Sequence, residues 1–416
     1  MFFLKGCYIM SAMKVLLLTN EYPPFVYGGA GVHVDYLSRE LSRLCKVDLR
    51  CFGNQKLAKP GLKVTGFDLR KLKTSAPKEL RPVWGAAQRC LDFNSAGTDA
   101  DIVHIHTWYT HLGGILAKLT YGIPLVLTTH SLEPLRPWKR EQLGRGYDFS
   151  CWVEKTALEM ADAVVAVSEE SRRDIFRFFR ISREKVHVIH NGIDPEEYRR
   201  VRAPEKITRL GIDLKKPYVL FVGRITRQKG IIYLVNAIRH MDPRFQVVLC
   251  AGSPDTKEIA REMNARVTAI QKKRPGVIWI NQMVDDPTKI ALYSHAALFC
   301  CPSIYEPFGI INLEAMACEV PVVASAVGGI KEVVVHGKTG ALVPLRQNRV
   351  SPFEPLLPEK FSKDLAREIN RLMSDPASRR RMGKAARKRV VEHFSWRSIA
   401  KSYYKLYRSL LASRPG

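Results

Sequence analysis

Two carboxylates, Glu306 and Glu314, stand eight residues apart in the segment EPFGIINLE. A pair of carboxylates can act as acid and nucleophile in a hydrolase. Here a turn and two turns of an expected helix separate them, which fits two contacts on one extended ligand better. The backbone N–H groups of Phe308, Gly309 and Ile310 lie at the expected start of that helix, where phosphate or sugar oxygens can bind.

Two cations, Arg224 and Lys229, stand five residues apart in the segment GRITRQKG, which follows a short apolar run. A guanidinium offers a planar fork of donors, and an ammonium offers a point charge. Both can neutralise the negative charge on a departing nucleotide diphosphate. The pattern favours a diphosphate site, and a solvated surface pair is the alternative.

A glycine-rich segment, PPFVYGGAG, contains Gly28 and Gly29 between an apolar run and a helical pattern. Glycines at such a position let backbone N–H groups approach phosphate oxygens. The third glycine of a dinucleotide-binding fingerprint is missing, because residue 34 is valine. NAD binding is therefore disfavoured, and a tight turn without a ligand is the alternative.

Several histidines and aspartates are candidate ligands for a metal ion. His130 follows Thr128 and Thr129 after the apolar run 125–127, so it is expected at a strand end that faces a ligand cleft. His104 and His106 share one face of a strand, but without a third ligand nearby a metal is not expected. Asp99 and Asp101 resemble a metal-binding DxD motif, yet they precede their strand and are interpreted as turn residues.

Short apolar runs alternate with helical patterns and would position these side chains. Six precede a polar connection at 195–217, and six follow it: 15–18, 47–51, 102–105, 125–127, 163–167, 186–189, 219–222, 246–250, 277–280, 298–301, 322–324 and 341–343. Runs that are apolar on both faces are typical of parallel sheets covered by helices. Two such series predict an α/β fold of two doubly wound domains, with ligands bound beyond the carboxyl ends of the strands.

The composition fits two globular domains in 416 residues. Lys and Arg total 66 against 40 Asp and Glu, so the net charge of +26 indicates anionic partners. Twelve basic residues lie between 376 and 416, where helical spacing of apolar residues predicts an amphipathic helix with a solvated basic face. Contact with nucleic acid or a membrane is the alternative.

The cysteines and the opening segment indicate in which cellular compartment the protein is expected. Nine cysteines form no CxxC pair and mostly lie in apolar runs, which indicates buried thiols in a reducing compartment. No apolar stretch reaches the roughly 20 residues that a spanning helix needs. Lys5 and Lys14 interrupt the apolar opening segment, which we interpret as leading into a strand and not as a secretion signal. We expect a cytoplasmic protein.

Taken in order along the chain, these motifs resemble those of a retaining GT-B glycosyltransferase. The segments 19–37, 104–110, 129–157, 188–194 and 301–318 are similar to those of actinobacterial-type glycogen synthases. That group includes enzymes that elongate α-1,4-glucan and enzymes that join ADP-glucose to glucose 1-phosphate. The resemblance implies an acceptor-side Rossmann-like domain at 1–200, a nucleotide-sugar domain at 201–395, and a final helix, 396–416, that returns to the first domain.

The resemblance also implies a donor site. Arg224 and Lys229 would hold the donor diphosphate, and Glu314 would hold the ribose. Glu306 and the amides of residues 308–310 would hold the transferred glucose. His130 would contact that glucose near its C6 hydroxyl. No cofactor and no metal is implied.

On the other side of the cleft, the resemblance implies that Gly28 and Gly29 face the diphosphate. The weaker candidates for the acceptor side are His106, Trp108 and Glu133. One departure concerns the first loop, where better-known glycogen synthases carry Lys-x-Gly-Gly and this chain has Val26 at the lysine position. The nucleotide and the acceptor are therefore left open.

The leading hypothesis is a glucosyltransferase that moves glucose from ADP-glucose or UDP-glucose to an α-1,4-glucan. The close alternative is a maltose-1-phosphate synthase with glucose 1-phosphate as acceptor. A phosphorylase, which needs a pyridoxal phosphate lysine, is a more distant alternative. From another class, a basic nucleic-acid-binding protein on an inactive transferase fold is disfavoured by the retained Glu306, Arg224 and Lys229. A homo-oligomer is among the expected assemblies.

Overall fold

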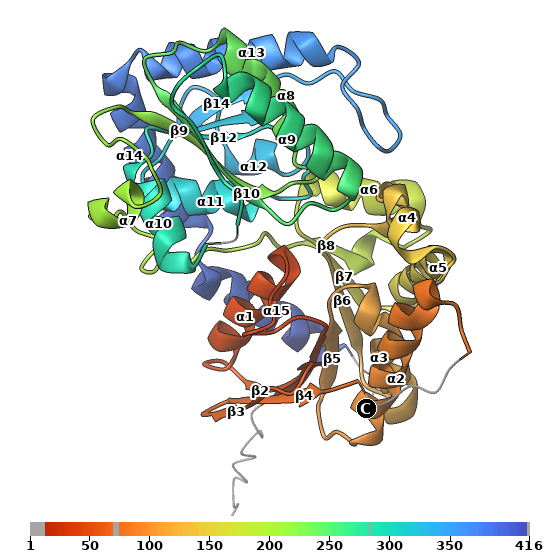
Figure 1. Ribbon diagram of the computed structural model, residues 1–416. Helices are drawn as coiled ribbons and strands as arrows, with labels where there is room; N and C mark the ends of the chain where they lie inside the picture. Colours follow the sequence, from red (N-terminus) through yellow and green to blue (C-terminus); the bar gives the residue numbers. More distant parts are fainter. Residues whose placement is uncertain (1–12, 70–74, 283, 414–416) are drawn as a thin grey trace, which may run out of the picture.

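The structure is a computed structural model that describes residues 13–69, 75–282 and 284–413. These residues form two lobes, and each lobe is a β-sheet between layers of helices (Figure 1). The first half of the chain builds the lower lobe of that view, and most of the second half builds the upper lobe. The predicted fold class, two Rossmann-like domains in a GT-B arrangement, is confirmed.

The first lobe contains an eight-stranded sheet among the described residues, in the order β3-β4-β2-β1-β5-β6-β7-β8. Neighbouring strands pair in parallel except β3 and β4, which pair antiparallel. The strands are β1 (Lys14–Thr19), β2 (Lys46–Phe52), β3 (Lys56–Lys59), β4 (Leu62–Phe67), β5 (Ile102–Ile105), β6 (Leu125–Thr129), β7 (Ala163–Ala166) and β8 (Val186–Val188).

Helices cover both faces of this sheet because alternate strand residues point to opposite sides. Leu16 and Leu18 of β1 pack with one group of helices, whereas Val15 and Leu17 pack on the other side. The helices of this lobe are α1 (Gly29–Leu41), α2 (Arg81–Ser95), α3 (Trp108–Tyr121), α4 (Arg140–Leu143), α5 (Gly146–Met160) and α6 (Glu169–Phe178).

The second lobe contains a six-stranded parallel sheet in the order β11-β10-β9-β12-β13-β14. Its strands are β9 (Tyr218–Arg224), β10 (Gln246–Gly252), β11 (Val277–Ile280), β12 (Leu298–Cys301), β13 (Val322–Ser325) and β14 (Gly340–Val343). Its helices are α7 (Pro204–Thr208), α8 (Ile231–Ala237), α9 (Lys257–Gln271), α10 (Asp286–His295), α11 (Ile310–Ala317), α12 (Ile330–Val333), α13 (Pro358–Met373) and α14 (Pro376–His393).

The last helix, α15 (Trp396–Ala412), leaves the second lobe and packs beside α1 in the first (Figure 1). Its buried side chains recur at helical spacing and join the core that contains Val15 and Leu17. Two of its hydroxyl groups reach the sheet: Tyr407 Oη lies 2.6 Å from His104 Nδ1, and Tyr403 Oη lies 3.0 Å from Thr128 Oγ1. The helix is therefore bound to the first lobe by both apolar burial and polar contacts.

Two features of the structure were not predicted. Each of the twelve apolar runs coincides with a strand, but β3 and β4 were missed because β3 is mostly exposed and β4 is buried at only two positions.

The basic segment after residue 376 was predicted to form a solvated face, but some of its basic side chains bind other parts of the protein. Arg387 donates to the carbonyl of Ala317 at 2.6 Å, and Arg389 donates to that of Glu332 at 2.7 Å, so both fasten α14 to its lobe.

The eight cysteines in the described residues are free thiols, and all but Cys151 are buried. Cys7 and Lys5 lie outside the described residues. Within the part of the chain that the structure describes, no helix is both long enough and apolar enough to cross a bilayer.

Candidate active site

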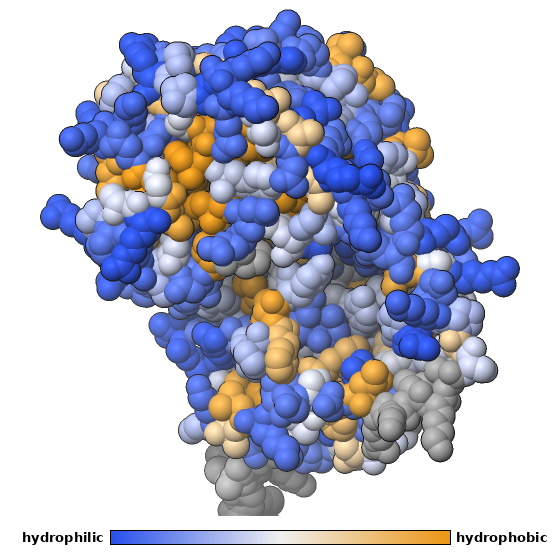
Figure 2. All heavy atoms as spheres, viewed as in Figure 1, coloured by the Kyte–Doolittle hydropathy of each residue, from blue (hydrophilic) through white to orange (hydrophobic). Residues whose placement is uncertain are grey.

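The sequence motifs lie at the points where each sheet reverses its strand order. β1 lies between β2 and β5, and β9 lies between β10 and β12, so the loops after these strands diverge to opposite faces. Ligands bind at such points in open α/β sheets. The two sets of loops face each other, since a Cβ added to Gly29 would lie 3.8 Å from Ile310 Cδ1 of the other lobe. The molecular outline is indented where the lobes meet (Figure 2).

The second-lobe motifs converge on an ion pair. Lys229 follows β9 and Glu306 follows β12, and because these strands are neighbours, Lys229 Nζ lies 2.7 Å from Glu306 Oε2. Ser303 Oγ also donates to that oxygen at 3.2 Å. Burial lowers the pKa of Lys229, but the charge of Glu306, the nearby Cys301 and the hydrogen bond to Glu306 together raise it more, so the pKa lies above its usual range. A permanently charged ammonium and a carboxylate thus stand side by side at the strand ends.

The start of α11 lies next to this pair. Gly309 adopts the left-handed conformation at φ +93°, and a Cβ there would lie 2.5 Å from Asn312 Nδ2, so the position requires glycine. The ring of Phe308 is buried and stacks on His190, with centroids 5.6 Å apart. Ile310 is the first residue of the helix. The first N–H groups of α11 are therefore free of intrahelical bonds and carry the positive end of the helix dipole.

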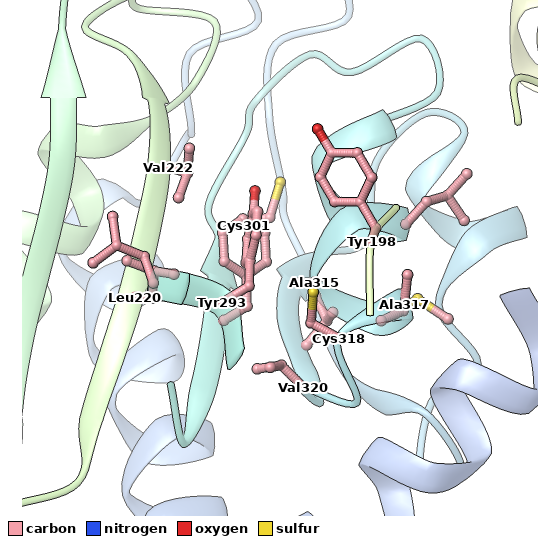
Figure 3. Close-up of a cluster of buried hydrophobic side chains, with 14 of the residues drawn as sticks. Tyr198, Leu220, Val222, Tyr293, Cys301, Ala315, Ala317, Cys318 and Val320 are labelled. Atoms are coloured by element: carbon pink, nitrogen blue, oxygen red, sulfur yellow. The ribbon is translucent and has the colours of Figure 1, made fainter. Parts of the chain in front are cut away.

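Glu314 lies one turn further along α11 and is buried in a polar network. Tyr293 Oη donates to Glu314 Oε2 at 2.9 Å, and Lys289 Nζ lies 3.4 Å from Oε1. Burial and the charge of Glu314 raise the pKa of Tyr293 well above its usual range, so its hydroxyl remains a donor. Tyr293 belongs to the apolar cluster that also contains Tyr198 (Figure 3). The carboxylate is thus held in one orientation by the core.

Arg224 joins the two lobes. Its guanidinium pairs with Asp255 and lies over the ring of Tyr27, with Cζ 4.3 Å from the centroid. Tyr27 comes from the glycine-rich loop of the first lobe and is 65% exposed. Burial raises the pKa of Asp255, although the charge of Arg224 opposes this. The arginine predicted at the cleft is therefore at the lobe interface.

Glu21, just before the glycine-rich loop, was not predicted from the sequence to take part in the site. Glu21 Oε2 accepts hydrogen bonds from the backbone N–H groups of Tyr27 at 2.9 Å and Gly28 at 2.8 Å. An anion is therefore already bound by the amides of this loop, as the helix dipole of α1 favours. A carboxylate seven residues before a glycine-rich helix start could have signalled this. Val26, at the position of the missing lysine, is 38% exposed.

His130 and His106 meet at the carboxyl ends of β6 and β5. His106 Nδ1 lies 3.1 Å from His130 Nε2, His106 is buried and His130 is partly exposed. His33 of α1, which the sequence reasoning did not single out, packs against both rings. Burial lowers the pKa of His130 well below its usual range, so the ring is neutral near pH 7. The fold therefore supplies the third histidine that the sequence did not place.

The other two acceptor candidates lie beneath the surface. Trp108 is 3% exposed and stacks on Tyr109, with centroids 4.0 Å apart. Glu133 is 2% exposed, and its carboxylate accepts hydrogen bonds from Lys139 Nζ at 2.8 Å and Ser150 Oγ at 3.0 Å. The acceptor role of both residues stays a prediction.

Asp99 and Asp101, the DxD segment, lie at the amino ends of the strands, opposite the ends that carry the candidate site. Asp101 accepts from the backbone N–H of Lys14 at 2.7 Å, and Asp99 pairs with the ammonium of Lys14. Both contacts fasten the beginning of β1, away from the carboxyl ends of the strands. The turn interpretation of these aspartates agrees with their place in the fold.

Two family models match the chain in succession: Glycosyltransferase Family 4 over residues 27–197, and Glycosyl transferases group 1 over residues 203–351. An alpha-maltose-1-phosphate synthase from Mycolicibacterium smegmatis is 45% identical over 408 residues, which are 96% of this chain and 100% of that protein. The chain belongs to the GT-B glycosyltransferases. It is accordingly a nucleotide-sugar-dependent hexosyltransferase of the group that contains glycogen synthases and maltose-1-phosphate synthases.

More distant glycosyltransferases agree with this assignment. A glycogen synthase from Mycobacterium tuberculosis is 28% identical and aligns with 97% of this chain and 96% of its own length. The structure of sucrose-phosphate synthase from Thermosynechococcus elongatus matches with a TM-score of 0.78 and 26% identity, and covers 97% of this chain and 100% of that one. The matches extend over both lobes, so the family assignment covers nearly the whole chain.

The geometry suits transfer from a glycosyl diphosphate. Breaking the bond between a sugar and a diphosphate develops negative charge on the leaving group and positive charge on the sugar. Fixed cations and helix N-termini can stabilise that leaving group without reorganisation. This glycosyltransferase offers such groups at the ends of β9 and β12 and at the starts of α1 and α11.

Proposed function

We propose that this glycosyltransferase is a maltose-1-phosphate synthase, which transfers glucose from ADP-glucose to glucose 1-phosphate with retention at the anomeric carbon. The observation that carries the proposal is the Lys229–Glu306 ion pair beside the start of α11. The choice of acceptor is supported by 45% identity to a protein of that name over its full length. Free buried thiols suit a reducing compartment, so we place the reaction in the cytoplasm.

In the proposed donor complex, Arg224 and Lys229 contact the diphosphate. Arg224 would exchange Asp255 for phosphate oxygens, the amides of Tyr27 and Gly28 would exchange the Glu21 carboxylate for them, and Gly29 would face the diphosphate beside them. Glu314, oriented by Tyr293, would accept from the ribose hydroxyls. Glu306 and the amides of residues 308–310 would bind the transferred glucose, and His130 would contact its C6 hydroxyl. In the contacts with the diphosphate, the ligand takes the place of partners that the free protein supplies from its own side chains.

The acceptor phosphate has a cationic neighbourhood in the first lobe. Arg136 and Lys139 both lie against Glu133, and their charges also lower the pKa of Asp255, which burial raises. Glu154 adjoins them, but burial and Glu133 raise its pKa well above the usual range and so favour its neutral form. Arg136 and Lys139 thus both face the Glu133 carboxylate, near Arg224 and Asp255. An acceptor with a phosphate group suits this excess of positive charge better than a neutral glucan does.

The proposed step breaks the bond between C1 of glucose and the oxygen of the diphosphate, and forms a bond from C1 to the 4-hydroxyl oxygen of the acceptor on the same face. The acceptor proton passes to the departing phosphate oxygen. Arg224, Lys229 and the amides at the start of α11 stabilise the charge on that leaving group. We propose no metal and no organic cofactor for this step, because the chain itself supplies the cations.

The test is nucleotide diphosphate release from ADP-glucose and from UDP-glucose, each with glucose 1-phosphate and with a linear α-1,4-glucan. We expect fast release with ADP-glucose and glucose 1-phosphate, and a product that is a disaccharide phosphate. Release with the glucan alone would overturn the acceptor assignment and establish polymer elongation, the second candidate, which the similarity to a glycogen synthase supports. Self-association, expected from the sequence, is tested separately by sedimentation.

A further inference from the structure

Three histidines from separate segments of the first lobe form a compact triangle. His33 lies on α1, His106 follows β5 and His130 follows β6. The ring centroids are 5.3 Å apart for His33 and His106, 4.8 Å for His33 and His130, and 5.4 Å for His106 and His130. One nitrogen from each ring lies within 4.8 Å of the other two.

These spacings match those of an ion bound by three imidazoles. Zinc–nitrogen bonds of about 2.0–2.1 Å at tetrahedral angles place the nitrogens about 3.4 Å apart and the ring centroids about 5 Å apart. His106 Nδ1 and His130 Nε2, at 3.1 Å, are already close to that separation. Because the three nitrogens lie within 4.8 Å of one another, the His33 ring needs to move by up to about 1.4 Å to complete the same geometry.

The third ring is oriented as a metal ligand. Asn191 Oδ1 lies 2.7 Å from His33 Nδ1, and an amide oxygen can only accept, so Nδ1 carries the proton and Nε2 carries the lone pair. His33 Nε2 is buried and has no hydrogen-bond partner among the described residues. A carbonyl oxygen behind a histidine is the usual outer contact of a metal-bound imidazole.

We propose that His33, His106 and His130 form a binding site for one divalent transition-metal ion, with Zn²⁺ as the ion that this donor set fits best. Three neutral imidazoles without a carboxylate suit Zn²⁺ better than Mg²⁺ or Ca²⁺. His130 is partly exposed, so a fourth position remains accessible. Bound metal would hold the His130 ring away from the donor sugar and inhibit transfer. That consequence rests on the proposed function, whereas the binding itself does not.

The experiment titrates the chelator-treated full chain with Co²⁺ and records visible absorbance, followed by displacement with Zn²⁺. We expect one Co²⁺ per chain with the absorption of a tetrahedral nitrogen and oxygen environment. His33→Gln should bind at least tenfold more weakly, and Asn191→Ala, which removes only the outer contact, should lose about 10- to 100-fold in affinity. The matched control is His240→Gln in the second lobe, which should bind like the wild type.

Three results would overturn the proposal: no Co²⁺ spectrum in the wild type, thiolate charge-transfer bands that indicate binding by cysteines, or equal affinity in the wild type and both variants. Inhibition is measured separately, as a rise in the KM for the donor with added Zn²⁺. If Co²⁺ binds with the expected spectrum and the KM is unchanged, the site stands and the proposed role of His130 fails.

Discussion

Lys229 and Glu306 depend on each other, because each is the charged partner of the other in a poorly solvated place. Their side chains are 22% and 8% exposed, so replacing one leaves the other with an uncompensated charge. The ion pair therefore holds both side chains in place at the strand ends. In the proposed donor complex, the diphosphate takes the place of Glu306 as the partner of Lys229, which changes this balance.

Glu314 offers a test of ground-state binding. Glu314→Gln keeps the shape of the side chain and removes the charge that Tyr293 and Lys289 hold in place. A hydrogen bond to a charged group contributes about 1.5–3 kcal/mol, so we expect the KM for the donor to rise about 10- to 100-fold. The kcat should change little, because a ribose contact is equal in the ground and transition states. Steady-state kinetics measure both constants, and a fall in kcat with an unchanged KM would refute the ribose contact. Glu319→Gln, just beyond α11, is the control.

The buried His111 is expected to lower the folding stability of the protein in acid. It is 2% exposed, and burial lowers its pKa from 6.5 to about 3. The unfolded chain then binds a proton that the folded chain does not, so stability falls as the pH drops below about 6.5 and continues to fall towards 3. Between pH 7 and pH 5 this one ring should cost about 2 kcal/mol.

Urea unfolding of the wild type and of His111→Leu at both pH values checks this expectation. The variant should lose about 2 kcal/mol less than the wild type between pH 7 and pH 5. An equal pH dependence in the two proteins would show that His111 does not remain neutral in the folded state.

Helix α15 connects the C-terminal part of the chain to the histidine cluster of the first lobe. Its hydroxyl contacts reach His104 and Thr128, and the ring centroid of His104 lies 4.2 Å from that of His106. The Trp396 ring also packs edge-on against His33. The elements that position His130 therefore include a helix more than 250 residues away along the chain.

Tyr407→Phe tests this connection. It leaves the buried His104 Nδ1 without the Tyr407 hydroxyl, which should lower the free energy of unfolding by about 1–3 kcal/mol. Tyr404→Phe, on the same helix and less buried, should change it by less than about 0.5 kcal/mol. Denaturant unfolding measures both, and equal stabilities for the two variants would contradict a structural role for the hydrogen bond.

Local signals were enough to predict most of the elements and the loops that carry the site. Runs such as LVLTT at 125–129 are apolar on both faces, and Gly309 stands where only glycine fits, so their places follow from neighbouring residues. His33 could not be found in this way. Its partners, the rings that follow β5 and β6, meet it only when the sheet forms.

Further contacts join the two lobes beside the proposed substrate site. Ser168 Oγ, the N-cap of α6, donates to the carbonyl of Pro307 at 2.7 Å. Glu332 accepts from His190 at 2.9 Å and from the backbone N–H of Glu169 at 3.0 Å. Pro307 follows Glu306 directly, so we expect a movement of the first lobe to displace the loop that holds the carboxylate. Closure of the lobes and assembly of the site are expected to occur together.

The net charge of +26 predicts a salt dependence of anion binding. A positive protein attracts ADP, and salt screens this attraction over a Debye length of about 10 Å at 0.1 M. We expect the Kd for ADP to rise several-fold between about 0.05 and 0.5 M salt. Adenosine, which carries no charge, should bind with the same Kd throughout. Calorimetry measures both ligands, and an ADP affinity independent of salt would show that the charge excess does not act on the donor.

The measurement that tests the account most directly is the kcat for transfer from the donor sugar in Lys229→Ala. Its control is Arg227→Ala, in the same loop, whose side chain is 61% exposed and lies 3.7 Å from Glu354. Loss of one group that stabilises the leaving charge should lower kcat about 100- to 1000-fold, while Arg227→Ala stays within about twofold of the wild type. Near-native turnover by a folded Lys229→Ala protein would contradict the assignment of the site to the ends of β9 and β12.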